Sequence, residues 1–141
     1  MAYLFDTDAI SNLLRPRPAP AFLRWLATVD RAEQYTSAVV VGELFKGAFR
    51  SQARNRHLAN IDQKILPRMT VLPYDTSIAR IFGEIRAELE REGRLLADAD
   101  LQIGATALYH GLTVVTGNLK HFSRIPGLVI ADIFARARRE S

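Results

Sequence analysis

The chain has 141 residues, of which 48% are hydrophobic and 24% charged, a balance typical of one soluble globular domain spanning 1–141. It contains no cysteine and only three histidines, which excludes a disulfide framework and argues against a zinc site. No apolar run reaches membrane-spanning length, and Asp6 and Asp8 stand where a signal peptide would be basic and then apolar, so we expect a cytoplasmic protein.

The first half of the chain alternates short apolar runs with helical patterns. The patterns predict a strand at Ala2–Phe5, helices at Thr7–Leu14 and Ala21–Arg31, an extended segment at Tyr35–Ser37, and helices at Ala38–Arg50 and Arg54–Leu66. The proline-rich residues 15–20 interrupt the first two helices. Ser37 is suited to cap the helix that follows it.

The second half repeats the alternation. It predicts strands at Thr70–Pro73, Leu112–Thr116 and Leu128–Ile130, helices at Thr76–Glu92 and Asp98–His110, and a loop at Gly117–Phe122. Asp75 is a suitable helix cap, while Gly93 and Gly111 are suited to end helices. Alternating strands and helices without hairpin signals predict a three-layer α/β/α domain with a mostly parallel central sheet.

Asp100 is the most informative acidic residue, because its position in the expected helix is unusual. It shares a face with Ile103, Gly104 and Ala107, whereas Asp98 lies on another face and is suited to cap the helix. A carboxylate among apolar and small residues is costly unless a positive group compensates it. A divalent cation held by carboxylates from distant segments would do so, and an oxygen-rich site favours Mg²⁺ or Mn²⁺.

Two further acids follow expected strands. Asp6 ends the first strand, and Glu43 lies in the helix after the second. Because sites in parallel sheets form at the carboxyl ends of strands, both can meet Asp100 there. Local alternatives remain open: Asp6 would also serve as a helix cap with Asp8 as a first-turn charge, and Glu43 would also pair with Lys46 in solvent.

Four segments together, in order and covering nearly the whole chain, resemble PIN-domain ribonucleases and, more narrowly, the VapC toxins of bacterial toxin–antitoxin pairs. They are residues 6–11, 36–44, 100–107 and 112–122.

The resemblance implies that Asp6, Glu43 and Asp100 are the catalytic acids that hold Mg²⁺ or Mn²⁺. The fourth acidic position of the family falls at Asn118, which we expect to weaken a second metal site without abolishing the first. His121 lies near a position where relatives often carry an acid, and we do not expect it to be catalytic.

The same resemblance implies an endoribonuclease that cuts structured RNA, such as tRNA or rRNA, to stop translation. Lys46, Arg50 and Arg54 are candidates for contacts with flanking RNA phosphates. The arginines at 136, 138 and 139 extend the basic character of the chain at its end.

The expected partners are a cognate VapB-like antitoxin and a second copy of the chain, as a homodimer within a toxin–antitoxin hetero-oligomer. Phe45, Phe49 and Leu58 are our candidates for the antitoxin contact. Thr7 and Thr116 flank the expected site, and we favour an ordinary capping role for both.

Two alternatives of other classes remain. The sequence Asp6-Thr7-Asp8 after a strand is similar to the nucleophile loop of haloacid-dehalogenase phosphatases, although Ala9 and Ile10 depart from that pattern. A non-catalytic PIN-like RNA-binding module is the other alternative, and Asn118 would then mark the loss of activity.

Overall fold

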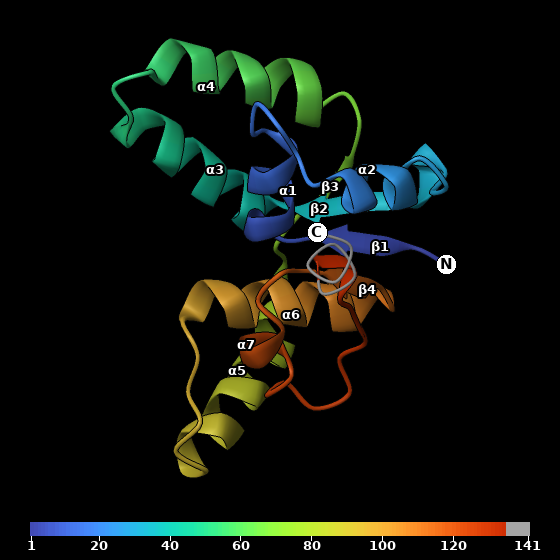
Figure 1. Ribbon diagram of the computed structural model, residues 1–141. Helices are drawn as coiled ribbons and strands as arrows, with labels where there is room; N and C mark the ends of the chain where they lie inside the picture. The colour runs from blue at the N-terminus through green and yellow to red at the C-terminus, as the bar shows by residue number, and fades with distance from the viewer. Residues whose placement is uncertain (135–141) are drawn as a thin grey trace.

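A five-stranded sheet, parallel at every pairing, forms the centre of the computed structural model, which describes residues 1–134 (Figure 1). The expected basic end at 136–139 lies outside the described residues. The strands are β1 (Tyr3–Phe5), β2 (Gln34–Ser37), β3 (Thr70–Leu72), β4 (Thr113–Val115) and β5 (Ile130–Ala131).

Helices cover both sides of the sheet, which confirms the three-layer α/β/α arrangement (Figure 1). One layer holds α1 (Thr7–Leu13), α2 (Pro20–Leu26), α3 (Ala38–Arg50), α4 (Arg54–Asn60) and the π-helical turn η2 (Ile61–Ile65). The other holds α5 (Thr76–Arg91), α6 (Asp98–His110) and α7 (Leu119–Phe122). Within residues 1–134, no helix is long and apolar enough to cross a membrane.

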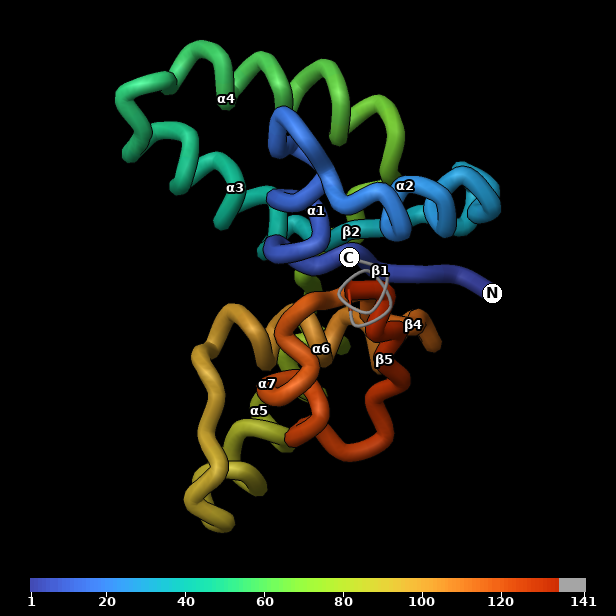
Figure 2. Tube along the Cα trace, viewed as in Figure 1, coloured from blue at the N-terminus to red at the C-terminus, as the bar shows by residue number. Residues whose placement is uncertain are grey.

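The strand order is β3-β2-β1-β4-β5, so the chain moves outward from β1 and then returns to its other side. Figure 2 shows this path, with β1 between the segments that hold β2 and β4. The order reverses between β1 and β4, and in parallel sheets ligands bind at the carboxyl ends of strands next to such a reversal. The topology therefore places a candidate site after Phe5 and Val115.

Several helix ends follow the sequence predictions. The Ser37 hydroxyl accepts a hydrogen bond from the Val40 amide at 3.1 Å, and Asp75 Oδ1 accepts one from the Ile78 amide at 3.1 Å. Gly93 and Gly111 both have φ of 66°, a left-handed conformation that ends a helix at little cost for glycine.

Three elements differ from the sequence prediction. The helix expected at Ala21–Arg31 ends at Leu26, because the chain turns and the Thr28 hydroxyl donates to the Trp25 carbonyl at 2.6 Å. A 3₁₀ turn, η1 (Arg31–Glu33), then leads into β2. The loop expected at Gly117–Phe122 contains α7 instead.

The prediction that Asp98 caps α6 is wrong. Ala97 occupies the cap position, and no side chain accepts a capping hydrogen bond there. The Asp98 carboxylate instead accepts a hydrogen bond from Arg86 Nε of α5 at 3.0 Å, so an ion pair between the two helices replaces the cap.

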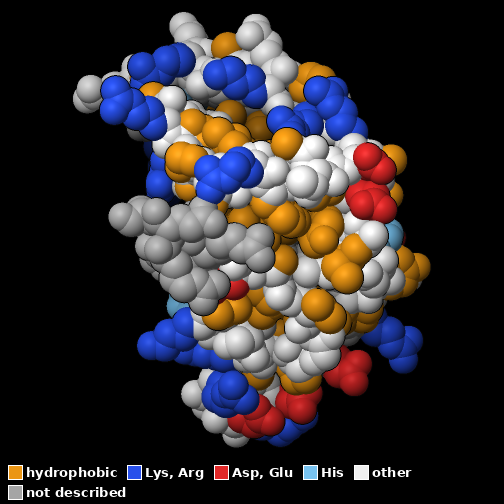
Figure 3. All heavy atoms as spheres, turned by 45° about the vertical axis from the view of Figure 1, so that its right-hand side comes forward, with side chains coloured by type: hydrophobic (Ala, Val, Ile, Leu, Met, Phe, Trp, Pro, Cys, Tyr) orange, Lys and Arg blue, Asp and Glu red, His pale blue; other side chains and the backbone are white. Residues whose placement is uncertain are grey.

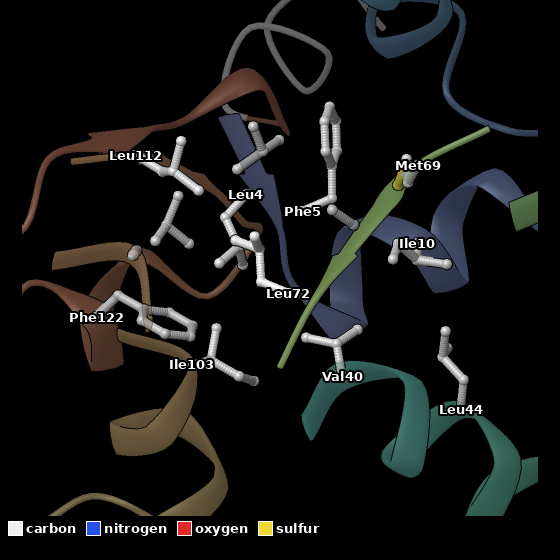
Figure 4. Packing of buried hydrophobic residues seen from close by; sticks show 14 of the residues in the cluster. Leu4, Phe5, Ile10, Val40, Leu44, Met69, Leu72, Ile103, Leu112 and Phe122 are labelled. Carbon is white, nitrogen blue, oxygen red and sulfur yellow. The ribbon is translucent and has the colours of Figure 1, made fainter. Parts of the chain in front are cut away.

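The core lies on both faces of the sheet. Leu4, Phe5, Val114 and Val115 of the two central strands are fully buried, as expected for strands covered by helices on both sides. Figure 4 shows the β1 residues with side chains from α3 on one side and from α6 and α7 on the other; these are Val40, Leu44, Ile103 and Phe122.

Candidate active site

The predicted acidic residues meet in one hollow at the carboxyl ends of β1 and β4. Asp6 follows β1, Glu43 comes from α3, Asp100 from α6, and Asn118 follows β4. The hollow has a volume of about 360 Å³, and its lining consists of Asp6, Thr7, Asp8, Ser11, Glu43, Asp100, Ile103, Gly117 and Asn118. Four positions that are far apart in the chain thus line a single cavity.

Asp6 is a buried carboxylate with only 3% of its surface exposed. The pKa of Asp6 is raised from 3.8 to about 7, chiefly by burial and to a lesser extent by the negative charges of Asp8 and Asp100. Hydrogen bonds from the Thr116 hydroxyl and from the Ala9 amide, the latter at 2.8 Å, oppose the rise in pKa. Asp6 caps α1, as one sequence interpretation expected, and it also lines the hollow, where its role as a metal-holding acid stays a prediction.

Glu43 is held by a neighbour from another helix. The Thr7 hydroxyl of α1 donates a hydrogen bond to Glu43 Oε1 at 2.6 Å. Within residues 1–134, Glu43 forms no ion pair with Lys46, so the exposed Glu43–Lys46 pair that the sequence also allowed does not hold the Glu43 side chain. Thr7 therefore orients a site carboxylate, and the capping role expected for it is wrong, because Asp6 caps α1.

Asp100 is partly buried, with 23% of its side chain exposed. Burial raises its pKa, and the negative charge of Glu43 raises it further, whereas His121 lowers it. The Nδ1 atom of His121 lies 3.6 Å from Asp100 Oδ2. Both Glu43 and His121 therefore influence the pKa of Asp100.

The apolar face predicted around Asp100 is buried. Ile103, Gly104 and Ala107 are inaccessible to solvent. A Cβ atom added at Gly104 would lie 2.5 Å from Ile125 Cδ1, so the absence of a side chain lets Ile125 pack directly on α6.

Asn118 and His121 form a polar pair at the start of α7. The Asn118 amide nitrogen and His121 Nδ1 are 2.8 Å apart, and the Asn118 backbone amide donates to the Thr116 hydroxyl at 2.8 Å. Sequence reasoning placed His121 outside the site, yet it contacts both Asn118 and Asp100. The sequence did indicate this proximity, because Asn118 and His121 are three residues apart, a spacing that places both on one face of a helical turn.

Asp8 and Ser11 also line the hollow, and sequence reasoning gave neither a site role. A Cβ atom at Gly117 would lie 2.5 Å from Asp8 Oδ2, so the loop after β4 passes close to α1 here. Asp8 was assigned to the first helical turn, where it does lie, but that turn faces the site.

The donor chemistry of the hollow suits a hard divalent cation. Its polar lining is made of carboxylate, hydroxyl and amide groups, and no Lys or Arg among the described residues lines it. Within residues 1–134, no three acidic or histidine side chains converge closely enough to hold an ion as they stand.

The basic residues proposed to contact RNA lie outside this hollow. Lys46 and Arg50 are exposed on α3. Arg54 Nη2 donates to the Phe49 carbonyl at 3.0 Å, and its guanidinium lies over the Phe49 ring at 5.7 Å from the centroid. Their contact with RNA stays a prediction.

Comparisons with known proteins agree with this fold. The PIN domain family model matches residues 3–128. The tRNA(fMet)-specific endonuclease VapC of Salmonella typhimurium is 35% identical over 132 residues, covering 94% of this chain and 98% of that protein. The toxin FitB of Neisseria gonorrhoeae is 36% identical over 124 residues, covering 84% of this chain and 89% of that protein.

Among solved structures, DNA-bound VapBC from Salmonella typhimurium matches with a TM-score of 0.86 and 34% identity, covering 94% of this chain and 98% of the matched one. A family model that spans most of the chain, relatives above 30% identity and the shared fold agree with one another. The chain belongs to the PIN-domain family, among its VapC-type members.

Proposed function

We propose that this protein is a metal-dependent endoribonuclease that acts as the toxin of a type II toxin–antitoxin pair. The observation that carries the proposal is the hollow itself, in which Asp6, Glu43 and Asp100 meet with no basic side chain among the described residues lining it. Relatives named as an endonuclease and as a toxin support both halves of the proposal.

Asp6, Glu43 and Asp100 would hold Mg²⁺ or Mn²⁺, with Asn118 as a neutral oxygen donor beside them. Such a cation, when bound, supplies Lewis-acid polarisation of the scissile phosphodiester. Its positive charge would also offset the burial and the carboxylate repulsion that together raise the pKa values of Asp6 and Asp100.

The protein's own side chains divide the remaining tasks. Thr7 fixes Glu43, while Thr116 and the first turn of α1 fix Asp6, so two carboxylates are oriented before substrate binds. One of the three carboxylates would take a proton from the attacking water.

The proposed substrate is a structured RNA, either tRNA or rRNA, cut at one or a few sites. The Salmonella relative is named for cleavage of one tRNA, which supports this class. Lys46, Arg50 and Arg54 remain our candidates for phosphates that flank the cleavage site.

The proposed partner is an antitoxin that covers the acidic hollow. A second hollow of about 440 Å³ adjoins it, shares Thr7, Ser11 and Glu43 with it, and is lined by apolar side chains of Leu14, Leu44, Ala48 and Ile61. An antitoxin helix with an apolar face would fit there, and an arginine on it would reach the carboxylates. The VapBC neighbour supports such a partner.

Exposed aromatic surface nearby supports further contacts. Phe49, near the end of α3, has 54% of its surface exposed, and we retain it with Phe45 and Leu58 as candidates for the antitoxin interface. We also propose that the toxin forms a homodimer within the complex, which analytical ultracentrifugation of the purified pair would test.

Replacement of one carboxylate tests the nuclease proposal. Asp100→Asn should abolish Mg²⁺-dependent cleavage of a tRNA pool while leaving the circular dichroism spectrum unchanged, because the half-buried charge is needed only for the reaction. Asp98→Asn is the matched control, since Asp98 lies two residues away and pairs with Arg86 outside the hollow. Loss of cleavage in Asp98→Asn but not in Asp100→Asn would contradict the assignment.

A further inference from the structure

A basic hollow lies beyond the end of α1, away from the acidic one. It has a volume of about 350 Å³ and is lined by Arg31, Lys64 and Arg68 together with apolar residues such as Leu13 and Leu23. Among the described residues that line it there is no Asp or Glu. None of the three basic side chains forms an ion pair within residues 1–134.

One guanidinium in this hollow is held in place by a buried relay. Arg68 Nε donates a hydrogen bond to Gln34 Oε1 at 3.0 Å. Gln34 is only 1% exposed, and its Nε2 atom donates to the Val29 carbonyl at 3.0 Å. The relay fixes the orientation of Arg68 before any ligand binds, which lowers the entropic cost of binding.

The charges in the hollow repel one another. Partial burial lowers the pKa of Arg68, and the nearby positive charge of Arg31 lowers it further. Cations brought together without a carboxylate partner favour the binding of an anion. Arginine suits a phosphate in particular, because its planar guanidinium can donate two parallel hydrogen bonds to phosphate oxygens.

The basic hollow and the acidic hollow lie on either side of the second hollow, with which each shares lining residues. The basic hollow shares Leu14 with the second hollow, the one lined by Leu44, Ala48 and Ile61. That second hollow shares Thr7, Ser11 and Glu43 with the acidic hollow. The path between them follows α1, whose Thr7–Leu13 span is roughly 10 Å long. Figure 3 shows basic side chains gathered around hydrophobic ones over the upper half of the molecule, which holds the α1–α4 layer.

We infer that the hollow formed by Arg31, Lys64 and Arg68 is a second binding site for phosphates of the RNA substrate, which holds the strand beyond the cleavage site. The inference rests on the proposed ribonuclease function. A single RNA strand carries a phosphate at every nucleotide, so one molecule supplies a phosphate to the reacting centre and others to the basic hollow. Lys46, Arg50 and Arg54 line neither of these two hollows.

Binding of RNA without cleavage tests the inference directly. Fluorescence anisotropy would measure the affinity of the full-length chain, without added metal, for fluorescein-labelled single-stranded oligoribonucleotides of increasing length. Arg68→Gln and Lys64→Gln remove one charge each, and Lys64 takes no part in the Gln34 relay. Arg91→Gln and Arg80→Gln, exposed on α5 in the other layer, remove the same charge elsewhere.

We expect each variant in the basic hollow to weaken the binding of long oligonucleotides about fivefold to tenfold, and to reduce the slope of log affinity against log salt by about 0.7. Oligonucleotides too short to reach the basic hollow should bind all variants equally, and the α5 variants should match the unmodified chain. Arg68→Lys should recover the salt slope but only part of the affinity, because lysine lacks the Nε–H that donates to Gln34.

Unchanged salt slopes in Arg68→Gln and Lys64→Gln, with thermal melts showing both folded, would overturn the inference. So would variants that keep their RNA affinity but lose binding of a labelled polyglutamate peptide, because the hollow would then serve an acidic protein. These outcomes are separable from failure of the proposed function, in which the unmodified chain cleaves no RNA whatever its affinity.

Discussion

The Thr7 hydroxyl lies 2.6 Å from Glu43 Oε1 and donates a hydrogen bond to it, joining the first turn of α1 to the middle of α3. The bond is partly buried, so water competes with it only in part. Asp6, the residue before Thr7, enters the same hollow from the end of β1. Of these two adjacent residues, Asp6 contributes one carboxylate to the hollow and Thr7 holds the carboxylate of Glu43.

Removal of the Thr7 hydroxyl should reduce both the rate of cleavage and the stability of the fold. Thr7→Val preserves the shape of the side chain but leaves Glu43 without its donor, so we expect a fall in cleavage rate of about tenfold or more and a loss of about 1–2 kcal/mol in the free energy of unfolding. Thr7→Ser keeps a hydroxyl and should retain most activity. Thr70→Val, on the exposed face of β3, is the control, and an equal loss of activity there would contradict the role of Thr7.

The metal-free protein should become less stable as the pH rises from about 4 to about 7. Burial raises the pKa of Asp6 from 3.8 to about 7, so across this range the folded state holds a proton that the unfolded state has released. The stabilisation is complete below the unfolded pKa and is lost as pH passes the folded one, at about 1.4 kcal/mol per unit of pKa difference. Urea unfolding in EDTA at several pH values would measure it.

Asp6→Asn should flatten that profile, because it removes the titrating group. Asp30→Asn, at an exposed position before η1, should leave the profile unchanged. A metal-free protein whose stability rises steadily from pH 4 to pH 7 would contradict the raised pKa of Asp6.

Packing beneath Asp100 should tolerate no added side chain. Gly104→Val would force the buried Ile125 to move, and we expect a loss of about 1–3 kcal/mol in the free energy of unfolding. Gly83→Val places the same side chain on α5 where nothing lies within 4 Å, so the change there should stay within about 0.5 kcal/mol. Denaturant melts that show equal losses for both variants would refute the close-packing argument.

The charge at residue 118 should control how tightly a second cation binds in the acidic hollow. Asn118→Asp adds a further negative charge beside Asp100 and His121, and we expect it to tighten binding of a second Mn²⁺ without abolishing cleavage. Asn55→Asp adds the same charge on the exposed side of α4 and serves as the control in calorimetric titrations. Two equally tight sites in the unmodified protein, without RNA, would show that Asn118 does not weaken the binding of a second cation.

The parts of the molecule that sequence predicted best are those set by local periodicity. The face around Asp100 follows from helical spacing alone, and Ile103 and Ala107 are buried as that spacing requires. The caps at Ser37 and Asp75 are also local, since each accepts from an amide three residues ahead. Such features depend on neighbours in the chain and not on the final packing.

The features that sequence missed depend on contacts between distant segments. From the sequence, Asp98 resembled a helix cap. In the fold, α5 packs against α6, and Arg86 pairs with the Asp98 carboxylate instead. The basic hollow draws Arg31 from η1 and Lys64 from η2, and in isolation each resembles an ordinary solvated charge. The role of Thr7 likewise requires α1 to lie against α3, which no local pattern specifies.

The acids of the hollow come from both helical layers, since Glu43 lies on α3 and Asp100 on α6, with Asp6 at the sheet between them. A cation bound to all of them joins segments that meet only after both crossover connections have formed. Because the three carboxylates come together only in the folded chain, we expect a bound cation to stabilise the native state and to slow unfolding.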